Sequence, residues 1–274
     1  MRSGAGDPGP LNPPPPESLS DPMSSSSSSS FASTHHDAGG RHKIKPYHAT
    51  VLSILGEMGA QRVLDAPCGQ GWLGQALKQQ GRSLHLDGLG LWEFPEADDG
   101  YASAREHDLD TPLPSNCQQY DAVVCGEALH LVRNPGLLLD GFVQAVRPGG
   151  RIIITTPNTW NLASRLQYFL RGYHSGFRPC VGLKRGDYIP YFPFSFPQLH
   201  LFLDSAGLQD IQLHEVNEPK PRRMRERLLA LPAKMYLSGR RRRAADAYER
   251  DYWTQAARDQ ALHGRWLVMS GKKG

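Results

Sequence analysis

A short glycine-rich segment carries the residues best suited to bind a charged cofactor. Leu64-Asp65-Ala66-Pro67-Cys68 leads into Gly69, Gly71 and Gly74, spaced as Gly-x-Gly-x-x-Gly. Glycines at this spacing let the backbone approach a bound molecule, and the N-terminus of a following helix favours an anionic group. Dinucleotide-binding turns have the same spacing, with a downstream acid, here Asp87, on the ribose hydroxyls. The glycines alone do not identify the ligand.

The acid and the proline that precede the glycines distinguish two kinds of cofactor. A dinucleotide places a pyrophosphate over the turn, where the carboxylate of Asp65 would repel it. Pro67 also removes one backbone N–H that would otherwise bind phosphate. S-Adenosylmethionine has no phosphate, and an acid attracts its ammonium and sulfonium groups while the helix N-terminus accommodates its carboxylate. The segment therefore favours S-adenosylmethionine, and an NAD-dependent oxidoreductase remains the alternative enzyme.

The elements around this segment alternate between strand and helix. Apolar runs and helical spacing predict them in the order helix 46–58, strand 62–66, helix to Gln80, strands 83–86, 103–107 and 120–125, helix 136–146, strand 151–156, helix 195–206, and strands 208–216 and 265–269. Arg147-Pro148-Gly149-Gly150 predicts a turn before the fifth strand. Such alternation is typical of a doubly wound parallel α/β sheet, which binds ligands at the carboxyl ends of its strands.

Composition limits what kind of protein this is. A chain of 274 residues with 39% hydrophobic content can form one large α/β domain, and a net charge of +4 does not by itself indicate a nucleic-acid binder. Four cysteines without a Cys-x-x-Cys pair argue against a metal site or a disulfide framework. Because no segment resembles a signal peptide or a membrane span, we expect a cytoplasmic protein. Residues 1–40, rich in Pro and Ser, are expected to be a disordered tail before a domain at 41–274.

Four motifs in order resemble those of the class I S-adenosylmethionine-dependent methyltransferases. In sequence these are Val63 to Gly71, then Asp108-Leu109 with Leu113-Pro114, then Tyr120 to Leu131, then Arg147 to Gly150 with Thr156-Pro157-Asn158. The resemblance covers about residues 45–216 and the last strand, and points to methyltransferase-domain proteins of the small-molecule or ubiquinone-biosynthesis type. It implies a Rossmann-like, doubly wound, mostly parallel sheet of seven strands. It also implies methyl transfer to an O, N or C nucleophile of a small-molecule, lipid or sugar-linked acceptor.

The resemblance also implies which residues bind the cofactor. They are Asp65, Ala66, Pro67, Gly69, Gly71, Asp87, Asp108, Leu109, Cys125 and Glu127. Two positions depart from the family's pattern: Pro67 replaces a frequent glycine, and Asp87 comes about one residue early for the acid that ends the second strand. His130 is predicted at the mouth of the site as a proton acceptor or substrate contact, with a structural role as its alternative. Asp121, at the start of a strand, is expected to be structural.

The second half of the chain is expected to hold the methyl acceptor. Beyond a cofactor half at about 60–157, an aromatic and basic lid at about 158–195 suits an anionic or ring-bearing molecule, although a plain packed subdomain would have the same composition. Methyl transfer from a sulfonium needs mainly alignment and exclusion of water, so the sequence does not identify the acceptor. A non-catalytic cofactor-binding or RNA-binding protein on the same fold also remains open.

A basic insertion is predicted before the last strand, at about 218–262. Within it, residues 220–243 combine basic and apolar side chains in a helix that we expect to be interrupted at Pro232. Two interpretations remain: a solvated insertion over the sheet edge, or peripheral attachment to an anionic membrane at its inner face, beside a lipid-linked acceptor. Aromatic residues for base stacking are scarce, so nucleic acid is less favoured. No obligate protein partner is evident.

Overall fold

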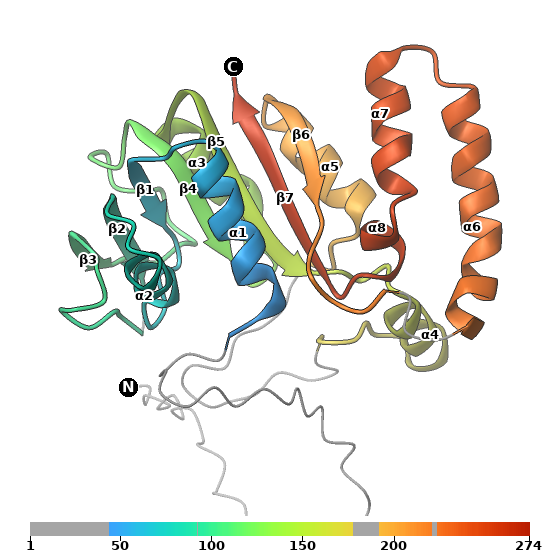
Figure 1. Cartoon of the computed structure of the whole chain (residues 1–274), viewed down its shortest axis with the longest axis horizontal. Helices are drawn as coiled ribbons and strands as arrows, with labels where there is room; N and C mark the ends of the chain where they lie inside the picture. The colour runs from blue at the N-terminus through green and yellow to red at the C-terminus, as the bar shows by residue number, and fades with distance from the viewer. Residues whose placement is uncertain (1–43, 92, 178–191, 221–223) are drawn as a thin grey trace, which may run out of the picture. The chain divides into compact units, whose positions relative to one another are not determined.

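A seven-stranded sheet forms the centre of the computed structural model, which describes residues 44–91, 93–177, 192–220 and 224–274. The strands are β1 (Arg62–Asp65), β2 (His85–Gly90), β3 (Ser103–Glu106), β4 (Tyr120–Gly126), β5 (Val146–Pro157), β6 (Leu208–His214) and β7 (Trp266–Lys273). Their order is β3-β2-β1-β4-β5-β7-β6, and β7 is the one strand that runs antiparallel to the others in this sheet (Figure 1). The predicted doubly wound, mostly parallel sheet of seven strands is thereby confirmed. The expected tail, residues 1–40, lies outside the described residues.

Helices cover both faces of this sheet, and the alternation of side chains along each strand explains how. On one face α1 (Pro46–Glu57) and α2 (Trp72–Gln79) pack on Val63, Val124 and neighbouring strand residues. On the other face α3 (Pro135–Ala145) and α5 (Phe196–Ser205) pack on Leu64, Val123 and their neighbours. Because successive strand residues point to opposite faces, Val63 and Leu64 belong to different halves of the core.

Local sequence signals explain where several helices begin and end. The Asn134 side chain accepts the N–H of Leu137 at the start of α3, and Pro135 occupies the first helical position. Ser195 and Gln198 form a capping box at the start of α5. The helix α4 (Leu162–Arg171) ends at Gly172, whose φ of 77° suits a residue without a Cβ.

Four elements, β2, β5, β7 and α6 (Met224–Arg242), differ clearly from the sequence-based expectation. β2 starts and ends later than predicted, at His85 and Gly90, and β7 continues to Lys273. β5 starts at Val146 and so includes the predicted turn, with a register shift against β4 and a φ of 77° at Gly149. Pro232 does not interrupt α6, which is continuous and mostly exposed. A proline removes one backbone hydrogen bond from the helix, and α6 nevertheless continues through it while packing against α4 and α7 (Ala247–Ala256).

The strand order reverses between β1 and β4, and that reversal locates the site. β1 pairs in parallel with β2 on one side and with β4 on the other. The connections that leave the carboxyl ends of β1 and β4 therefore diverge to opposite sides, and ligands bind in the crevice between them. In this chain those connections are the glycine-rich turn and the segment from Gly126 to His130.

The amino ends of the same strands are held by Asp121, as expected for a structural residue. Its Oδ2 accepts the backbone N–H groups of Gln61 and Arg62, each at 2.8 Å, and its Oδ1 accepts Nε of Arg147 at 2.6 Å. Although burial alone raises the pKa of Asp121, hydrogen bonds from Arg147 and the two backbone groups bring it below its ordinary value.

Replacing Asp121 with Asn should destabilise the fold by about 1–3 kcal/mol at neutral pH, because a charged acceptor of three hydrogen bonds becomes a neutral one. The pKa of Asp121 is lower in the folded state than in the unfolded state, where it is about 3.9, so the charged carboxylate stabilises the fold above that pH. This stabilisation is lost as the pH falls through the folded-state pKa. The difference from wild type should therefore be constant above about pH 4 and shrink below it. Urea unfolding at several pH values measures this, with Asp140→Asn on exposed α3 surface as the control; equal effects of both substitutions would contradict the assignment.

Candidate functional site

The glycine-rich turn leaves β1 and leads into α2. Beyond β1 the backbone still pairs on both sides, since Ala66 N–H donates to Val124 at 2.9 Å and Cys68 N–H donates to Leu89 at 2.8 Å. Gly69 and Gly71 have φ values of 49° and 87°, a conformation that side chains rarely adopt. A Cβ added at Gly69 would meet no atom within 4 Å. The turn therefore presents open backbone at the carboxyl edge of the sheet.

A loop after β2, residues 93–101, packs over the other side of this turn. A Cβ at Gly71 would lie 2.7 Å from Pro95, and one at Gly74 would lie 2.0 Å from the carbonyl oxygen of Asp99. Asp99 is buried and accepts hydrogen bonds from Gln75 of α2 at 2.6 Å and from the backbone of Glu96 at 2.7 Å. Gly71 and Gly74 thus serve chain packing, and Gly69 is the glycine that faces open space.

Asp65 ends β1 as a fully buried carboxylate. Its Oδ2 accepts the hydroxyl of Tyr101 at 2.6 Å, whereas its Oδ1 is buried without a hydrogen-bond partner. Burial raises the pKa of Asp65 to about 7, against the opposing effect of the Tyr101 hydrogen bond. A buried acceptor left unpaired is costly, and a cationic group beside Oδ1 would remove that cost and stabilise the charged form.

Glu127 follows β4 and is held from three directions. It adopts a positive φ of 52°, and its N–H lies 3.0 Å from Oγ1 of Thr155 on β5. Its carboxylate forms an ion pair with Lys45 and accepts hydrogen bonds from Tyr47 and from Nε1 of Trp266, each at 2.9 Å. Burial raises its pKa, but the Lys45 charge and these donors bring the pKa below its ordinary value. Glu127 is therefore charged and fixed in position.

His130 lies buried three residues further on. Its Nδ1 is 3.3 Å from Oγ1 of Thr156, and its ring centroid is 6.1 Å from that of Phe177. Burial lowers its pKa to about 4, and the charge of Lys45 lowers it further while that of Glu127 opposes the shift. The imidazole is consequently neutral at physiological pH, with one of its two ring nitrogens unprotonated.

Asp87 is not brought to this site, which corrects its expected position at the end of β2. The strand continues to Gly90, and Asp87 pairs with Leu64, so its side chain lies on the opposite sheet face from Asp65. There it accepts hydrogen bonds from Ser103 at 2.6 Å and Tyr120 at 2.8 Å. Burial raises its pKa, but these donors and His85 bring the pKa below its ordinary value. Asp87 joins β2, β3 and β4 and has a structural role.

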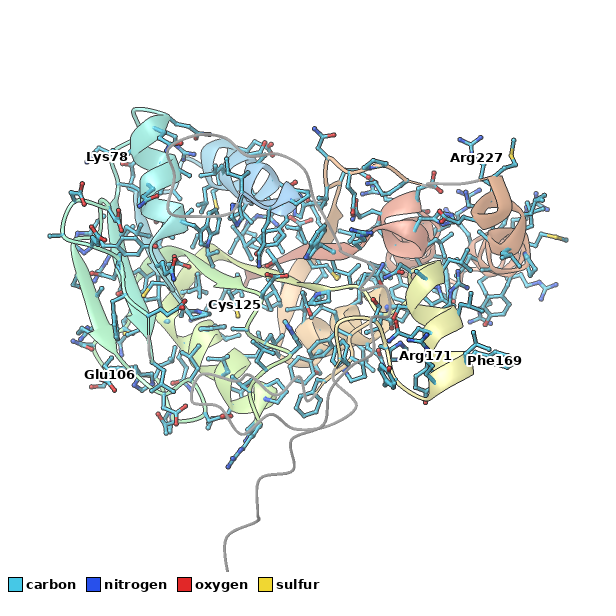
Figure 2. All side chains as sticks on the ribbon, turned by 90° about the horizontal axis from the view of Figure 1, so that it is seen from below. Lys78, Glu106, Cys125, Phe169, Arg171 and Arg227 are labelled. Atoms are coloured by element: carbon cyan, nitrogen blue, oxygen red, sulfur yellow. The ribbon has the colours of Figure 1, made fainter. Side chains whose placement is uncertain are left out.

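The remaining predicted residues lie at or below the carboxyl edge. Asp108 follows β3, is exposed, and accepts the N–H of Asp110 at 2.9 Å, while Leu109 is buried in the core. Cys125 is also fully buried, on the α3 face, and burial raises the pKa of its thiol to about 12 (Figure 2). Only backbone atoms of Cys125 are therefore suited to meet a ligand. Ala66 is buried, and Pro67, half-buried, follows it through a cis peptide bond.

A carboxylate that the sequence pattern did not single out lies beside the turn. Glu93 follows β2 by three residues, is exposed, and accepts Nε2 of Gln70 at 3.3 Å. Because Gly90, the last residue of β2, has no side chain, Glu93 is the nearest acid after that strand. The absence of an acid at the end of β2 is the sequence signal that points to the following loop, residues 93–101, as the source of one.

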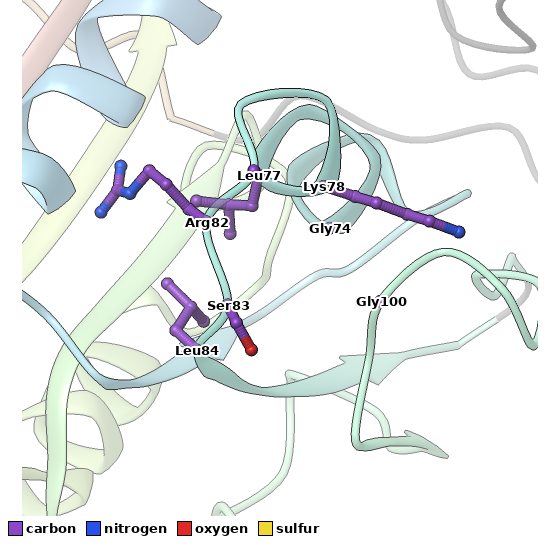
Figure 3. A pocket seen from close by; sticks show the side chains of 8 residues that line it. Gly74, Leu77, Lys78, Arg82, Ser83, Leu84 and Gly100 are labelled. Atoms are coloured by element: carbon purple, nitrogen blue, oxygen red, sulfur yellow. The ribbon is translucent and has the colours of Figure 1, made fainter.

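A cavity of about 300 Å³ lies elsewhere, beside α2 (Figure 3). Gly74, Leu77, Lys78, Gly81, Arg82, Ser83, Leu84 and Gly100 line it. Residues 81–84 precede β2, so much of the cavity lies toward the amino end of that strand, and none of the predicted site residues contributes to it. Within the described ranges no group of His, Cys, Asp and Glu side chains has the arrangement of a metal site.

Comparisons with known proteins agree with one another on the kind of domain. Residues 31–213 match the sequence model of the family described as Methyltransferase domain. The ubiquinone biosynthesis O-methyltransferase of Aeromonas salmonicida (strain A449) is 30% identical over 131 residues, which are 43% of this chain and 52% of that protein. The protein of the same name from Hydrogenovibrio crunogenus (strain DSM 25203 / XCL-2) is 29% identical over 133 residues, 44% of this chain and 52% of that protein. The chain thus spans about half the length of these curated relatives.

Among solved structures, the S-adenosylmethionine-dependent methyltransferase SibL in its apo form has the same fold. Its TM-score against this chain is 0.50, at 16% sequence identity, over 82% of this chain and 54% of that chain.

The raised pKa of Asp65 has a measurable consequence for the ligand-free protein. A carboxyl whose folded-state pKa lies above its unfolded value of about 3.9 makes the fold less stable as the pH rises between the two values. Asp65→Asn, which does not ionise, should lack this loss, so its stability relative to wild type should rise from about pH 4 to pH 7 and then level off. Tyr101→Phe removes the hydrogen bond that opposes the shift, so its loss of stability should extend to a higher pH than in wild type. Chemical denaturation across this range tests the point, and parallel profiles for wild type and Asp65→Asn would contradict it.

Proposed function

Because this chain belongs to the methyltransferase-domain family, within the class I S-adenosylmethionine-dependent methyltransferases, we propose that it transfers a methyl group to a nucleophilic atom of a small-molecule acceptor. The single observation that best supports the cofactor is the buried, unpartnered Oδ1 of Asp65 beside the open backbone of Gly69. An ammonium group satisfies that oxygen, whereas a pyrophosphate does not.

The residues around the turn fit S-adenosylmethionine when each is matched to one part of it. Asp65 suits the ammonium, and the backbone of Gly69 with the N-terminus of α2 suits the carboxylate. Glu93 replaces Asp87 as the acid for the ribose hydroxyls, since it lies beside Gln70 of the turn. Asp108 and Leu109 remain the proposed adenine contacts. When bound, this cofactor supplies an electrophilic methyl group on a good leaving group.

At the reacting end the chain must orient a nucleophile and accept its proton. We assign proton acceptance to the neutral imidazole of His130, which Thr156 holds through Nδ1. Glu127 is bound to Lys45, Tyr47 and Trp266, so it fixes the N-terminal helix and the last strand around the site. The two relatives are named as O-methyltransferases, and a hydroxyl acceptor is the kind that benefits from such a base.

Both alternatives to this function are less well supported. An NAD-dependent oxidoreductase would place a pyrophosphate over the turn, where the carboxylate of Asp65 would repel it. No specific observation favours a non-catalytic protein on this fold, whereas the two curated relatives are named as methyltransferases. In the proposed division of the chain, 41–274 is the methyltransferase domain, with its cofactor half at 60–157, acceptor lid at 158–195 and basic insertion at 218–262.

The basic insertion forms part of an apolar surface that suits an anionic membrane. α6 exposes Met224, Leu228, Leu229, Leu231, Met235 and Tyr236, and α4 exposes Leu166, Tyr168, Phe169 and Leu170. Phe169 is 84% exposed and projects from α4, which packs against α6 (Figure 2). Arg240 to Arg243 lie at the end of α6. No described helix is long and apolar enough to cross a membrane, so the contact we propose is peripheral and places the enzyme near a lipid-linked acceptor.

The first test of the function is cofactor binding by titration calorimetry. We expect S-adenosylhomocysteine to bind, NAD not to bind, and Asp65→Ala to weaken binding by about 10- to 100-fold through loss of a charged acceptor. Gly69→Val should abolish binding, because a side chain would occupy the open space over the turn. Asp87→Asn is the matched control and should bind as wild type does. Tight NAD binding with no response to S-adenosylhomocysteine would overturn the proposal; transfer from labelled cofactor to fractionated cell extract then identifies the acceptor.

His130→Gln should slow methyl transfer by about 100-fold without changing cofactor affinity, because the base is lost while the volume is kept. His214 on β6 is a suitable control, since burial likewise lowers its pKa to about 4 and it hydrogen-bonds Ser270 away from the turn. His214→Gln should leave the rate unchanged. The single-turnover rate of methyl transfer is measured for both variants. An unaltered rate for His130→Gln would show that His130 has a structural role only.

Replacing Arg240 to Arg243 with Ser should weaken binding to anionic vesicles on the order of 1,000-fold at low salt, since each basic side chain near the surface contributes about 1 kcal/mol. Replacing Leu228 and Met235 with Ser should weaken it as well. Lys78→Ser on α2 serves as the control. Co-sedimentation with phosphatidylserine and phosphatidylcholine vesicles measures the effect; equal binding to both lipids, or none, would remove the membrane proposal.

A further inference from the structure

Two basic residues, Arg165 of α4 and His263 of α8 (Asp259–His263), have buried side-chain nitrogens without hydrogen-bond partners, although the Arg165 residue as a whole is only partly buried. Nε and Nη2 of Arg165 lack acceptors, although the guanidinium carbon lies 4.6 Å from the ring centroid of Trp160. The His263 side chain is only 2% exposed, and both of its ring nitrogens lack a hydrogen-bond partner. Buried polar nitrogens are nearly always hydrogen-bonded in folded proteins, so those of Arg165 and His263 point to a missing partner.

The charge of Arg165 is one of several that act on the imidazole of His263. Asp259, Lys234 and Glu226 supply the others, and burial is the largest of the influences that bring its pKa below the ordinary value. Asp259 lies 3.9 Å from Nε2 of His263, but Nζ of Lys234 already binds its Oδ1 at 2.8 Å. The guanidinium of Arg165 has no such carboxylate among the ion pairs of the described residues.

This pair lies beside the carboxyl end of β5, on the acceptor side of the glycine-rich turn. Asn158 follows β5, and its Nδ2 donates to the carbonyl of Ala261 at 3.0 Å and to that of Gly264 at 2.8 Å. His263 is therefore held next to the segment that leads from Asn158 through Trp160 to Arg165. Two residues before Asn158, Thr156 holds His130.

We propose that Arg165 and His263 form a binding site for an oxyanion, a carboxylate or a phosphate, that the methyl acceptor carries. A planar guanidinium stacked on an indole presents its N–H groups in the geometry that either anion accepts, and an imidazole supplies a second donor. The evidence for an anion site is the unpartnered nitrogens of Arg165 and His263. That the bound anion belongs to the methyl acceptor rests on the proposed function. The acceptor class is then an anionic molecule whose charged end lies between α4 and α8, with its nucleophile toward His130.

The test uses the full chain with inorganic phosphate and benzoate as separate probes. Calorimetric titration should show that at least one of them binds, and ¹⁵N-histidine spectra should show the His263 ring nitrogens shifting on binding. Arg165→Gln and His263→Gln should each weaken binding at least tenfold. Arg171→Gln, at the end of the same helix, is the matched control and should retain wild-type affinity. Binding of phosphate alone supports a phosphorylated acceptor, and binding of benzoate alone supports a carboxylate.

The proposal is overturned if neither probe binds, or if Arg165→Gln and Arg171→Gln have equal affinities. Circular dichroism checks folding; if Arg165→Gln is unfolded, Trp160→Ala and His263→Gln take its place, and unchanged probe affinity in both would overturn the site. Titration of the same samples with S-adenosylhomocysteine separates the two proposals. If the wild-type protein binds phosphate or benzoate but not S-adenosylhomocysteine, the methyltransferase function is rejected and the anion site is retained.

Discussion

The parallel pairing of β1 with β2 and β4 at once is the constraint on which the rest of the site depends. It continues past the end of β1, where Ala66 pairs with β4 and Cys68 with β2, so the glycine-rich turn is suspended between two strands. The same pairing carries Asp65 and Glu127 to one edge of the sheet. Because every side chain at that edge inherits its position from strand register, a shift of one residue would exchange the two faces and dismantle the arrangement.

Two acids at this edge differ in pKa for reasons that the structure makes explicit. Both are largely buried, and burial alone raises the pKa of each. Glu127 pairs with Lys45 and accepts hydrogen bonds from two further side chains, so it stays charged. Asp65 accepts one hydrogen bond from a hydroxyl group, and its other oxygen has no hydrogen-bond partner. Glu127 is thus suited to hold protein elements together. Asp65 is the acid of the two whose carboxyl group keeps one oxygen without a hydrogen-bond partner.

The sequence predicted the sheet, its helices and the glycine-rich turn because these follow from periodicity, caps and glycine spacing that are local in the chain. It misplaced Asp87 because one residue of strand register decides which face a side chain occupies, and register depends on pairing with β1 and β3. Glu93 escaped notice because it lies in a loop with no repeating pattern. Arg165 and His263 are 98 positions apart, so only the tertiary fold brings their unpartnered nitrogens into one neighbourhood.

The loop after β2 has a consequence for redesign of this scaffold. Gly71 and Gly74 make room for Pro95 and Asp99, and the same loop delivers the hydroxyl of Tyr101 to Asp65. An engineer who wished to install a nucleotide-diphosphate ligand would gain little by neutralising the acid alone, because the loop already fills the space on that side of the turn. Loop 93–101 and the glycine-rich turn pack as one unit, so they would have to be exchanged together.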